Sequence, residues 1–185
     1  MARKKEYSEA KVIEKAMDLF WKNGYESTSM QLLEREMGIN KFSIYSSFGS
    51  KSGVFLESIK CYKKKLSEIT DKLHESKNGI VGIKQYFYDF LKFSQKDKDM
   101  RGCLITNTAN ELSDTSDSKI KVQLSKFTEY IRDLFEKNLR YETNMPEEMI
   151  QEKADYYIVS MFGLSSASKI FSENQLHIFI ENIFK

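Results

Sequence analysis

Residues 29–51 read SMQLLEREMGINKFSIYSSFGSK and contain two short helical segments separated by a glycine. Ser29 has a side-chain oxygen that can cap the first segment, and Gly38 can end it in a left-handed conformation that larger residues resist. The second segment covers about residues 41–47. Two short helices joined by a tight turn that contains glycine are typical of a helix-turn-helix unit.

A longer amphipathic segment over about residues 8–23 precedes this pair, and its apolar residues recur at helical spacing. The apolar residues of its face are Val12, Ile13, Ala16, Met17, Leu19 and Phe20. The residues that can pack the two short helices onto this face are Leu32, Leu33, Ile39, Ile44 and Phe48. The polar face of the second short helix is then free to enter a DNA major groove.

The rest of the chain has the pattern of an all-α protein. Apolar residues step by three and four along the longer segments, and only one proline and eight glycines punctuate the whole chain. The expected helices cover about residues 51–73, 80–95, 103–112, 119–141, 146–171 and 175–184, with loops at 96–101 and 113–118. Together with the three N-terminal helices, the sequence predicts about nine helices.

The composition is that of a globular protein, with 41% hydrophobic and 30% charged residues among 185. Residues 1–65 have a formal charge of +5, from 13 Lys or Arg and 8 Asp or Glu, whereas the remainder has −3, from 16 and 19. A basic N-terminal part fits a nucleic-acid partner. Because no apolar run could cross a bilayer, the start does not resemble a signal peptide, and two cysteines give no disulfide framework, we expect a cytoplasmic protein.

Residues 12–56 resemble the DNA-binding domain of TetR-family transcriptional regulators. The resemblance rests on Ala16, Leu19, Phe20, Gly24, Tyr25, Thr28, Ser29, Met30, Gly38, Ile39, Ile44, Tyr45, Phe48, Ser50, Lys51 and Phe55. It implies a helix-turn-helix DNA-binding domain over residues 1–50 and a helical ligand-binding and dimerisation domain over residues 51–185. It also implies a repressor that binds double-stranded operator DNA as a homodimer and is released by a small-molecule inducer.

By position, the resemblance assigns DNA contacts to residues at the starts of the two short helices and of the helix that follows them. Those expected at base edges are Gln31, Lys41, Phe42 and Ser46, and those expected at phosphates are Ser29, Ser43, Tyr45, Ser47 and Lys51, with Met30 also in contact. Phe42 departs from the family pattern, in which glycine or proline is common there. Its ring could contact a thymine methyl group or pack against the protein.

The last two expected helices are apolar on more than one side, and the small residues between Gly163 and Ser168 permit close helix approach. A symmetric four-helix interface between two copies is the natural use of such helices. The residues assigned to this interface are Tyr157, Met161, Leu164, Ser168, Leu176, Phe179, Ile180 and Ile183. The alternative is ordinary core packing within one chain.

The resemblance also implies a ligand pocket enclosed by the fourth to seventh helices. The residues assigned to its lining are Tyr62, Tyr86, Phe87, Phe90, Cys103, Asn107, Phe127 and Tyr130. Aromatic residues at helical spacing are also typical of a plain core. Solid packing in this region would favour the alternative, a helical DNA-binding or architectural protein that needs no ligand.

Cys103 is expected at the start of a short helix, close to Arg101, where the helix dipole and a positive charge favour the thiolate. Such a thiol could sense oxidants or electrophiles, and the alternative is a small buried core residue. An enzyme is the rival class, but the sequence has no metal-ligand cluster, phosphate loop or nucleophile motif, and His74 and His177 lie far apart. We therefore expect no catalytic residues, cofactor or metal site.

Overall fold

The computed structural model describes residues 7–95, 101–113 and 117–185, and within these residues the chain forms nine α-helices and no strand. The helices are α1 (Glu9–Asn23), α2 (Met30–Met37), α3 (Lys41–Phe48), α4 (Lys51–Glu75), α5 (Gly79–Ser94), α6 (Leu104–Ala109), α7 (Ser118–Leu139), α8 (Glu147–Ala167) and α9 (Glu173–Ile183). The prediction of an all-α fold is confirmed. Most of the loop expected at 96–101 and the middle of the one expected at 113–118 lie outside the described residues.

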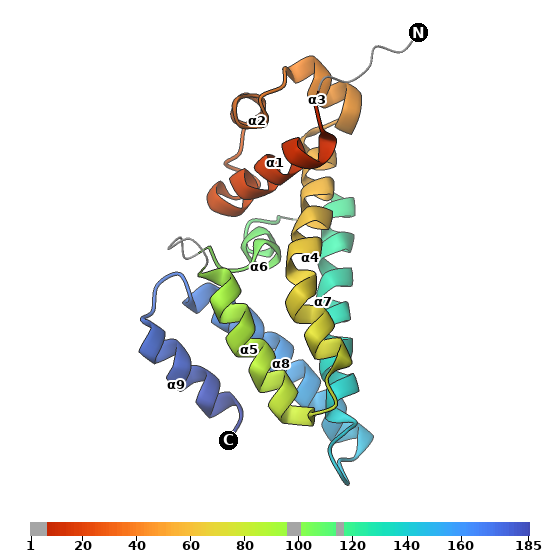
Figure 1. The fold of residues 1–185 in the computed structure, drawn as a ribbon, viewed down its shortest axis with the longest axis vertical. Helices are drawn as coiled ribbons and strands as arrows, with labels where there is room; N and C mark the ends of the chain where they lie inside the picture. The colour runs from red at the N-terminus through yellow and green to blue at the C-terminus, as the bar shows by residue number, and fades with distance from the viewer. Residues whose placement is uncertain (1–6, 96–100, 114–116) are drawn as a thin grey trace.

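The helices form a small head and a larger body, which α4 connects (Figure 1). We call α1, α2 and α3 the head; they lie at one end of the molecule. The 25-residue α4 begins at the head and runs into the body alongside α7, while α5, α8 and α9 lie at the far end. Helix α1 packs against α4, and α4 also packs against α5 and α7 in the body. The head is therefore attached to the body through α4.

The two short helices of the head begin and end where the sequence provides caps. The side chains of Ser29 and Asn40 accept hydrogen bonds from the backbone N–H groups of Leu32 and Ser43, at 3.2 and 2.8 Å. Gly38 ends α2 with a φ of 69°, in the left-handed region. Each side-chain cap is worth about 1 kcal/mol, which matters for helices of eight residues that are marginal alone. The caps at Ser29 and Gly38 are confirmed, and the cap at Asn40 adds to them.

The turn between α3 and α4 is tight, and its contacts hold α3 in place relative to α4. The Ser50 side chain accepts a hydrogen bond from the Gly53 N–H at 3.0 Å and so caps α4. A Cβ atom at Gly53 would lie 1.9 Å from the carbonyl oxygen of Phe48, so only glycine permits this approach.

Aromatic side chains join the helices in three successive groups along the core. In the head, the Phe20 ring lies 4.9 Å from that of Phe55 and holds α1 against α4. Between head and body, the rings of Trp21 and Tyr62 meet edge to face at 5.1 Å. The third group, at the far end of the body, consists of Tyr86, Phe87, Phe135, Tyr157 and Phe184.

Three hydrogen bonds fasten the head to the residues on either side of α6. The indole N–H of Trp21 donates to the carbonyl oxygen of Gly102 at 3.1 Å, and this bond is buried. The Arg101 guanidinium lies 3.3 Å from the Asp18 carboxylate. Beyond α6, the side chain of Glu111 accepts a hydrogen bond from the Glu26 N–H at 2.8 Å. The head is therefore fixed to the body by polar contacts as well as through α4.

Candidate nucleic-acid interface

Helix α3 has one buried face and one exposed face. Ile44 is fully buried and holds the helix onto the head. The exposed residues are Lys41, Phe42, Tyr45 and Ser46; we call them the outward face of α3. Phe42 is 82% exposed and Tyr45 44%. The ammonium group of Lys41 lies 5.9 Å from the centre of the Tyr45 ring, as expected for residues one helical turn apart.

Two of the predicted contact residues on α3, Ser43 and Ser47, are half-buried and face the start of the chain. The hydroxyl groups of Tyr7 and Ser47 form a hydrogen bond of 2.8 Å, and the Tyr7 hydroxyl lies 3.5 Å from the Ser43 carbonyl oxygen. Tyr7 thus supports α3 from the residues before α1. Sequence reasoning missed this role, because nothing in the pattern links residues 40 positions apart.

The start of α2 lies near α3 in the head and presents further polar groups. Ser29 and Gln31 are exposed, whereas Met30 is half-buried. The Ser29 oxygen accepts the capping hydrogen bond from Leu32, so its own O–H is still available as a donor. Gln31 can offer both a donor and an acceptor to a base edge.

Lys51, at the first position of α4, is held against the head and does not extend freely into solvent. Its ammonium group donates to the Glu26 carbonyl oxygen at 3.2 Å and lies 4.4 Å from the centre of the Tyr25 ring. Partial burial lowers the pKa of Lys51 below its ordinary value, and the nearby Glu26 and Glu111 act in the opposite direction. The position of this positive charge is therefore fixed at the base of α3 and α4.

The structure corrects most of the expected dimer residues. Seven of the eight are buried within the single chain: Tyr157, Met161, Leu164, Ser168, Leu176, Ile180 and Ile183. They pack inward from α8 and α9, so a second copy of the chain cannot reach them. Of the eight, Phe179 alone is exposed, at 39%. For these seven residues the alternative, core packing within one chain, is correct.

A different set of apolar residues on and between α8 and α9 faces solvent. Its members are Tyr156, Val159, Ile170, Phe171, Ile178 and Phe179; we call them the apolar face. Gly163 is also exposed here, and a Cβ atom added to it would meet only the tip of Phe179, at 3.8 Å. Both α8 and α9 are apolar on two sides, and helical spacing alone does not tell which side faces inward.

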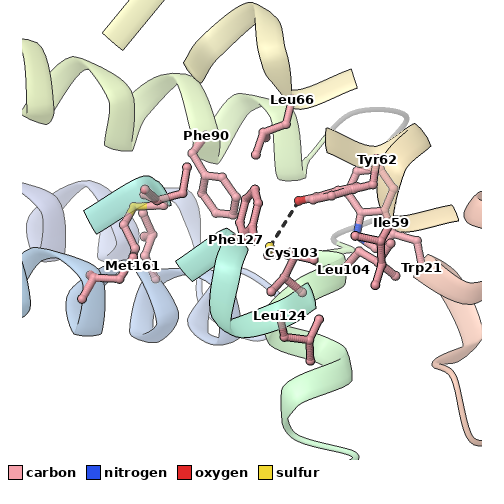
Figure 2. Close-up of a cluster of buried hydrophobic side chains, with 14 of the residues drawn as sticks. Trp21, Ile59, Tyr62, Leu66, Phe90, Cys103, Leu104, Leu124, Phe127 and Met161 are labelled. Atoms are coloured by element: carbon pink, nitrogen blue, oxygen red, sulfur yellow. Dashed lines mark hydrogen bonds between the residues drawn. The ribbon is translucent and has the colours of Figure 1, made fainter. Parts of the chain in front are cut away.

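A small apolar cavity of about 30 Å³ lies in the body between α4, α5, α6, α7 and α8. Four of the predicted pocket residues line it: Tyr86, Phe90, Cys103 and Phe127. The lining residues that were missed are Leu66, Ile105, Thr106, Thr128, Ile131, Ile158, Met161, Phe162 and Ser165. Figure 2 shows Phe90, Phe127 and Met161 close together in this part of the core. A volume of this size has room for about one water molecule.

The other four predicted pocket residues do not line this cavity. Tyr62 packs on Trp21 and donates a hydrogen bond to the Cys103 sulfur, and Phe87 belongs to the aromatic group at the far end of the body. The Asn107 side chain donates to the Arg101 carbonyl oxygen at 2.8 Å. Tyr130 is 42% exposed on α7. These four side chains therefore make other contacts or are exposed, and their part in a ligand pocket stays a prediction.

Cys103 lies in the core and is only 5% exposed. Its backbone N–H donates to the Ser165 hydroxyl at 2.9 Å, and its sulfur accepts a hydrogen bond from the Tyr62 hydroxyl at 3.2 Å (Figure 2). Burial raises the pKa of Tyr62 well above its usual value, so this hydroxyl stays protonated as the donor. Arg101 has its guanidinium group on Asp18 and over the Trp21 ring. These contacts favour the interpretation of Cys103 as a core residue.

Two kinds of feature are absent from the part of the chain that the structure describes. Among these residues, no group of three or more His, Cys, Asp or Glu side chains could hold a metal ion. None of the described helices combines the length and the apolar character needed to cross a membrane.

Residues 12–58 match the family model described as bacterial regulatory proteins, tetR family. The chain is 30% identical over 112 residues to the uncharacterized HTH-type transcriptional regulator YezE of Bacillus subtilis, a match covering 60% of this chain and 58% of YezE. It is 29% identical over 105 residues to the biofilm operon icaADBC HTH-type negative transcriptional regulator IcaR of Staphylococcus aureus, covering 56% of each. The matched part thus spans little more than half the length of these curated relatives.

The similarity in three dimensions extends over nearly the whole chain. A solved structure of a cysteine mutant of the TetR family transcriptional regulator CifR, complexed with 26bp double-strand operator DNA, superposes with a TM-score of 0.86. It shares 26% sequence identity, and the match covers 98% of both chains. The arrangement of head and body is therefore one already known from solved regulators.

Proposed function

We propose that this chain is a DNA-binding transcriptional regulator of the TetR type that recognises a specific operator, since residues 12–58 match the family model of bacterial regulatory proteins, tetR family. The observation that carries the proposal is the outward face of α3. An α-helix fits the major groove of B-DNA, and the residues exposed there combine a positive charge, hydroxyl groups and two aromatic rings. Such a mixed surface suits contact with phosphates and base edges together.

Within this proposal, the contacts divide by chemistry. Base edges are contacted by Gln31, Lys41, Phe42 and Ser46, and phosphates by Ser29, Ser43, Tyr45, Ser47 and Lys51, with Met30 at the same surface. The fixed position of the Lys51 ammonium supports its part, because a charge held in place needs no ordering on binding. For Ser47, the existing bond to Tyr7 would be shared with the phosphate, since a hydroxyl both donates and accepts.

We propose that the regulator is a homodimer formed through the apolar face of α8 and α9. A two-fold interface uses the same surface on both copies, and the apolar face would bring four helices together. Burying its six large side chains would remove from water a patch of the kind that marks protein interfaces. Two copies then place two α3 helices on successive major-groove turns, about 34–36 Å apart.

The experiment that tests this function is selection of bound duplexes from a random DNA library by the full chain. We expect enrichment of an inverted repeat whose half-sites lie about one helical turn apart. A variant with Lys41→Ala and Ser46→Ala, both exposed and thus harmless to folding, should lose the enrichment while keeping the helical content. Recovery of no preferred sequence by the folded wild-type chain would count against the proposal.

Repression is the proposed direction of control, acting in the cytoplasm where the operator lies. The name of IcaR describes a negative regulator. The simplest action of a compact protein bound at an operator is to block access of other proteins to that DNA. Placing the selected operator over a reporter promoter tests the direction. Reporter activity should fall when the chain is expressed, and a rise would reverse the assignment.

We further propose that a small apolar inducer acts through the cavity of the body. What supports this is an apolar cavity where five helices meet, and one of them, α4, also packs against the head. At about 30 Å³ the cavity must expand to take an inducer, by movement of Phe127, Met161 and Phe162. The close packing around this cavity supports the alternative, a regulator that needs no ligand.

The two alternatives differ in the response to apolar compounds. Under the inducer proposal, a compound that raises the melting temperature of the protein also lowers its operator affinity. Thr128→Ile, whose larger apolar side chain would fill the cavity from α7, should remove both effects while leaving operator binding unchanged. Compounds that bind without any change in operator affinity would support the regulator without a ligand.

A further inference from the structure

Phe42 is the most exposed of the large hydrophobic side chains in the part of the chain described here, at 82%. It is the second residue of α3, and it does not belong to the hydrophobic core or to the side chains packed against it. The alternative raised by the sequence, a ring packed against the protein, is therefore wrong. A single exposed apolar residue needs no explanation in general, but this one lies within the outward face of α3.

The neighbours of Phe42 restrict what the ring can contact. Lys41 precedes it, and Tyr45 and Ser46 lie on the same side of the helix one turn later. This face, with an ammonium group, two hydroxyl groups and two aromatic rings, differs from the apolar face of α8 and α9, whose six exposed members are all large hydrophobic residues. Phe42 therefore fits an anionic partner that also offers an apolar group.

The major groove offers one such group. Its base edges present hydrogen-bond donors and acceptors, and the C5-methyl group of thymine is the apolar feature among them. In recognition helices the N-terminal residues contact the base edges, and Phe42 is at this end of α3. Insertion between bases from the minor groove is disfavoured, because that groove, about 6 Å wide, does not admit an α-helix.

We propose that Phe42 specifies a thymine in each half-site of the operator by packing its ring against the C5-methyl group. This inference rests on the proposed function, since it concerns the same surface and names the base that one residue selects. Replacing the ring removes an apolar contact but no charge. Phe42 therefore affects which sequence is bound more than how strongly the chain binds DNA in general.

The test replaces thymine by deoxyuridine, which pairs identically but lacks the methyl group. In the duplex selected by the wild-type chain, each thymine of a half-site is replaced in turn, together with its symmetry mate, and affinity is measured by fluorescence anisotropy. We expect one position per half-site at which affinity falls, about fourfold for each methyl group lost from an apolar contact. Replacement of thymines elsewhere should leave affinity within twofold.

The variant Phe42→Ala tests whether the sensitivity to the thymine methyl group depends on the Phe42 ring. It should bind thymine and deoxyuridine duplexes equally at the sensitive position, whereas Ser46→Ala, on the same face, should keep the difference. Because Phe42 contributes nothing to the core, the variant should fold as the wild type does, and circular dichroism checks this.

The results of these binding measurements distinguish the role of Phe42 from the proposed DNA-binding function. A wild-type chain that selects a sequence but is insensitive to every deoxyuridine substitution overturns the role of Phe42 and leaves the DNA-binding function standing. The same holds if Phe42→Ala keeps the full sensitivity. A folded chain that selects no sequence removes both.

Discussion

The outward face of α3 and the apolar face of α8 and α9 both expose large hydrophobic side chains, but they differ in what surrounds those side chains. On α3, Phe42 and Tyr45 are interleaved with Lys41 and Ser46. On and between α8 and α9, six large apolar residues are exposed, and Gly163 is exposed near Phe179. Interfaces between proteins exclude charge from their centre, whereas DNA-binding surfaces require it. The neighbours of an exposed ring, and not its exposure, indicate its partner.

The largest expected effect comes from placing a charge in the apolar face. Val159→Glu should turn the dimer into a monomer and lower operator affinity by about 100-fold or more, because each copy then contacts one half-site alone. Light scattering at micromolar concentration and a gel-shift titration measure the two effects. Val81→Glu is the matched control: Val81 on α5 is 69% exposed, close to the 71% of Val159, but lies outside the apolar face. A dimeric Val159→Glu protein would place the interface elsewhere.

The corrected dimer residues give the second test, which concerns stability. Leu164 is fully buried, so Leu164→Ala should lower the free energy of unfolding by about 2–5 kcal/mol through lost burial and a residual cavity. The exposed Val81→Ala should change it by less than about 0.5 kcal/mol. Urea denaturation at fixed protein concentration gives both values. Equal values for the two variants would contradict the inward orientation of Leu164.

A smaller effect is expected for the fixed charge at the start of α4. Lys51→Gln should weaken binding to every DNA sequence alike and reduce the salt dependence of log K by about one unit per copy, the contribution of one phosphate contact. Titration at several salt concentrations measures the slope. Lys60→Gln serves as the comparison, because Lys60 is exposed further along α4 and pairs with Glu57. If the slope is the same in both variants, Lys51 does not contact phosphate.

The smallest effect is expected where the head meets the body. Glu111→Ala removes the acceptor of the Glu26 N–H and should lower operator affinity only two- to threefold, in line with about 0.5 kcal/mol for an exposed hydrogen bond. The amide hydrogen of Glu26 should exchange faster with solvent in this variant. In Glu111→Gln a side-chain oxygen is retained, so exchange should stay slow. Equal exchange in all three proteins would mean that Glu111 does not hold the head.

Signals from neighbouring residues predicted the helices well. The predictions that were wrong depended on contacts between residues far apart in the sequence. The cap at Ser29 and the glycine at Gly38 were correctly interpreted because caps depend on neighbours within four residues. The assignment of Leu164 to a dimer interface failed because α8 is apolar on two sides, and only tertiary packing decides which is inside. The bond between Tyr7 and Ser47 joins residues whose pairing no local pattern encodes.

The pocket residues show a different reason for partial success. Phe90 and Phe127 were placed correctly at the cavity, yet Phe87, on the same helix as Phe90, packs toward the other end of the body. The aromatic content of α5 indicates that its side chains are buried. It does not indicate the volume left between them, which depends on how five helices pack together.

Helix α4 has the length and position of a lever between the head and the body. Its 25 residues span about 37 Å, so a tilt of about 5° at the body end displaces the head end by about 3 Å. In a symmetric pair both heads would move, and their separation would change by about the spacing of one or two base pairs, 3.4 Å each along the duplex axis. A shift in packing no larger than a side-chain rotation would suffice to take two reading helices out of register with their grooves.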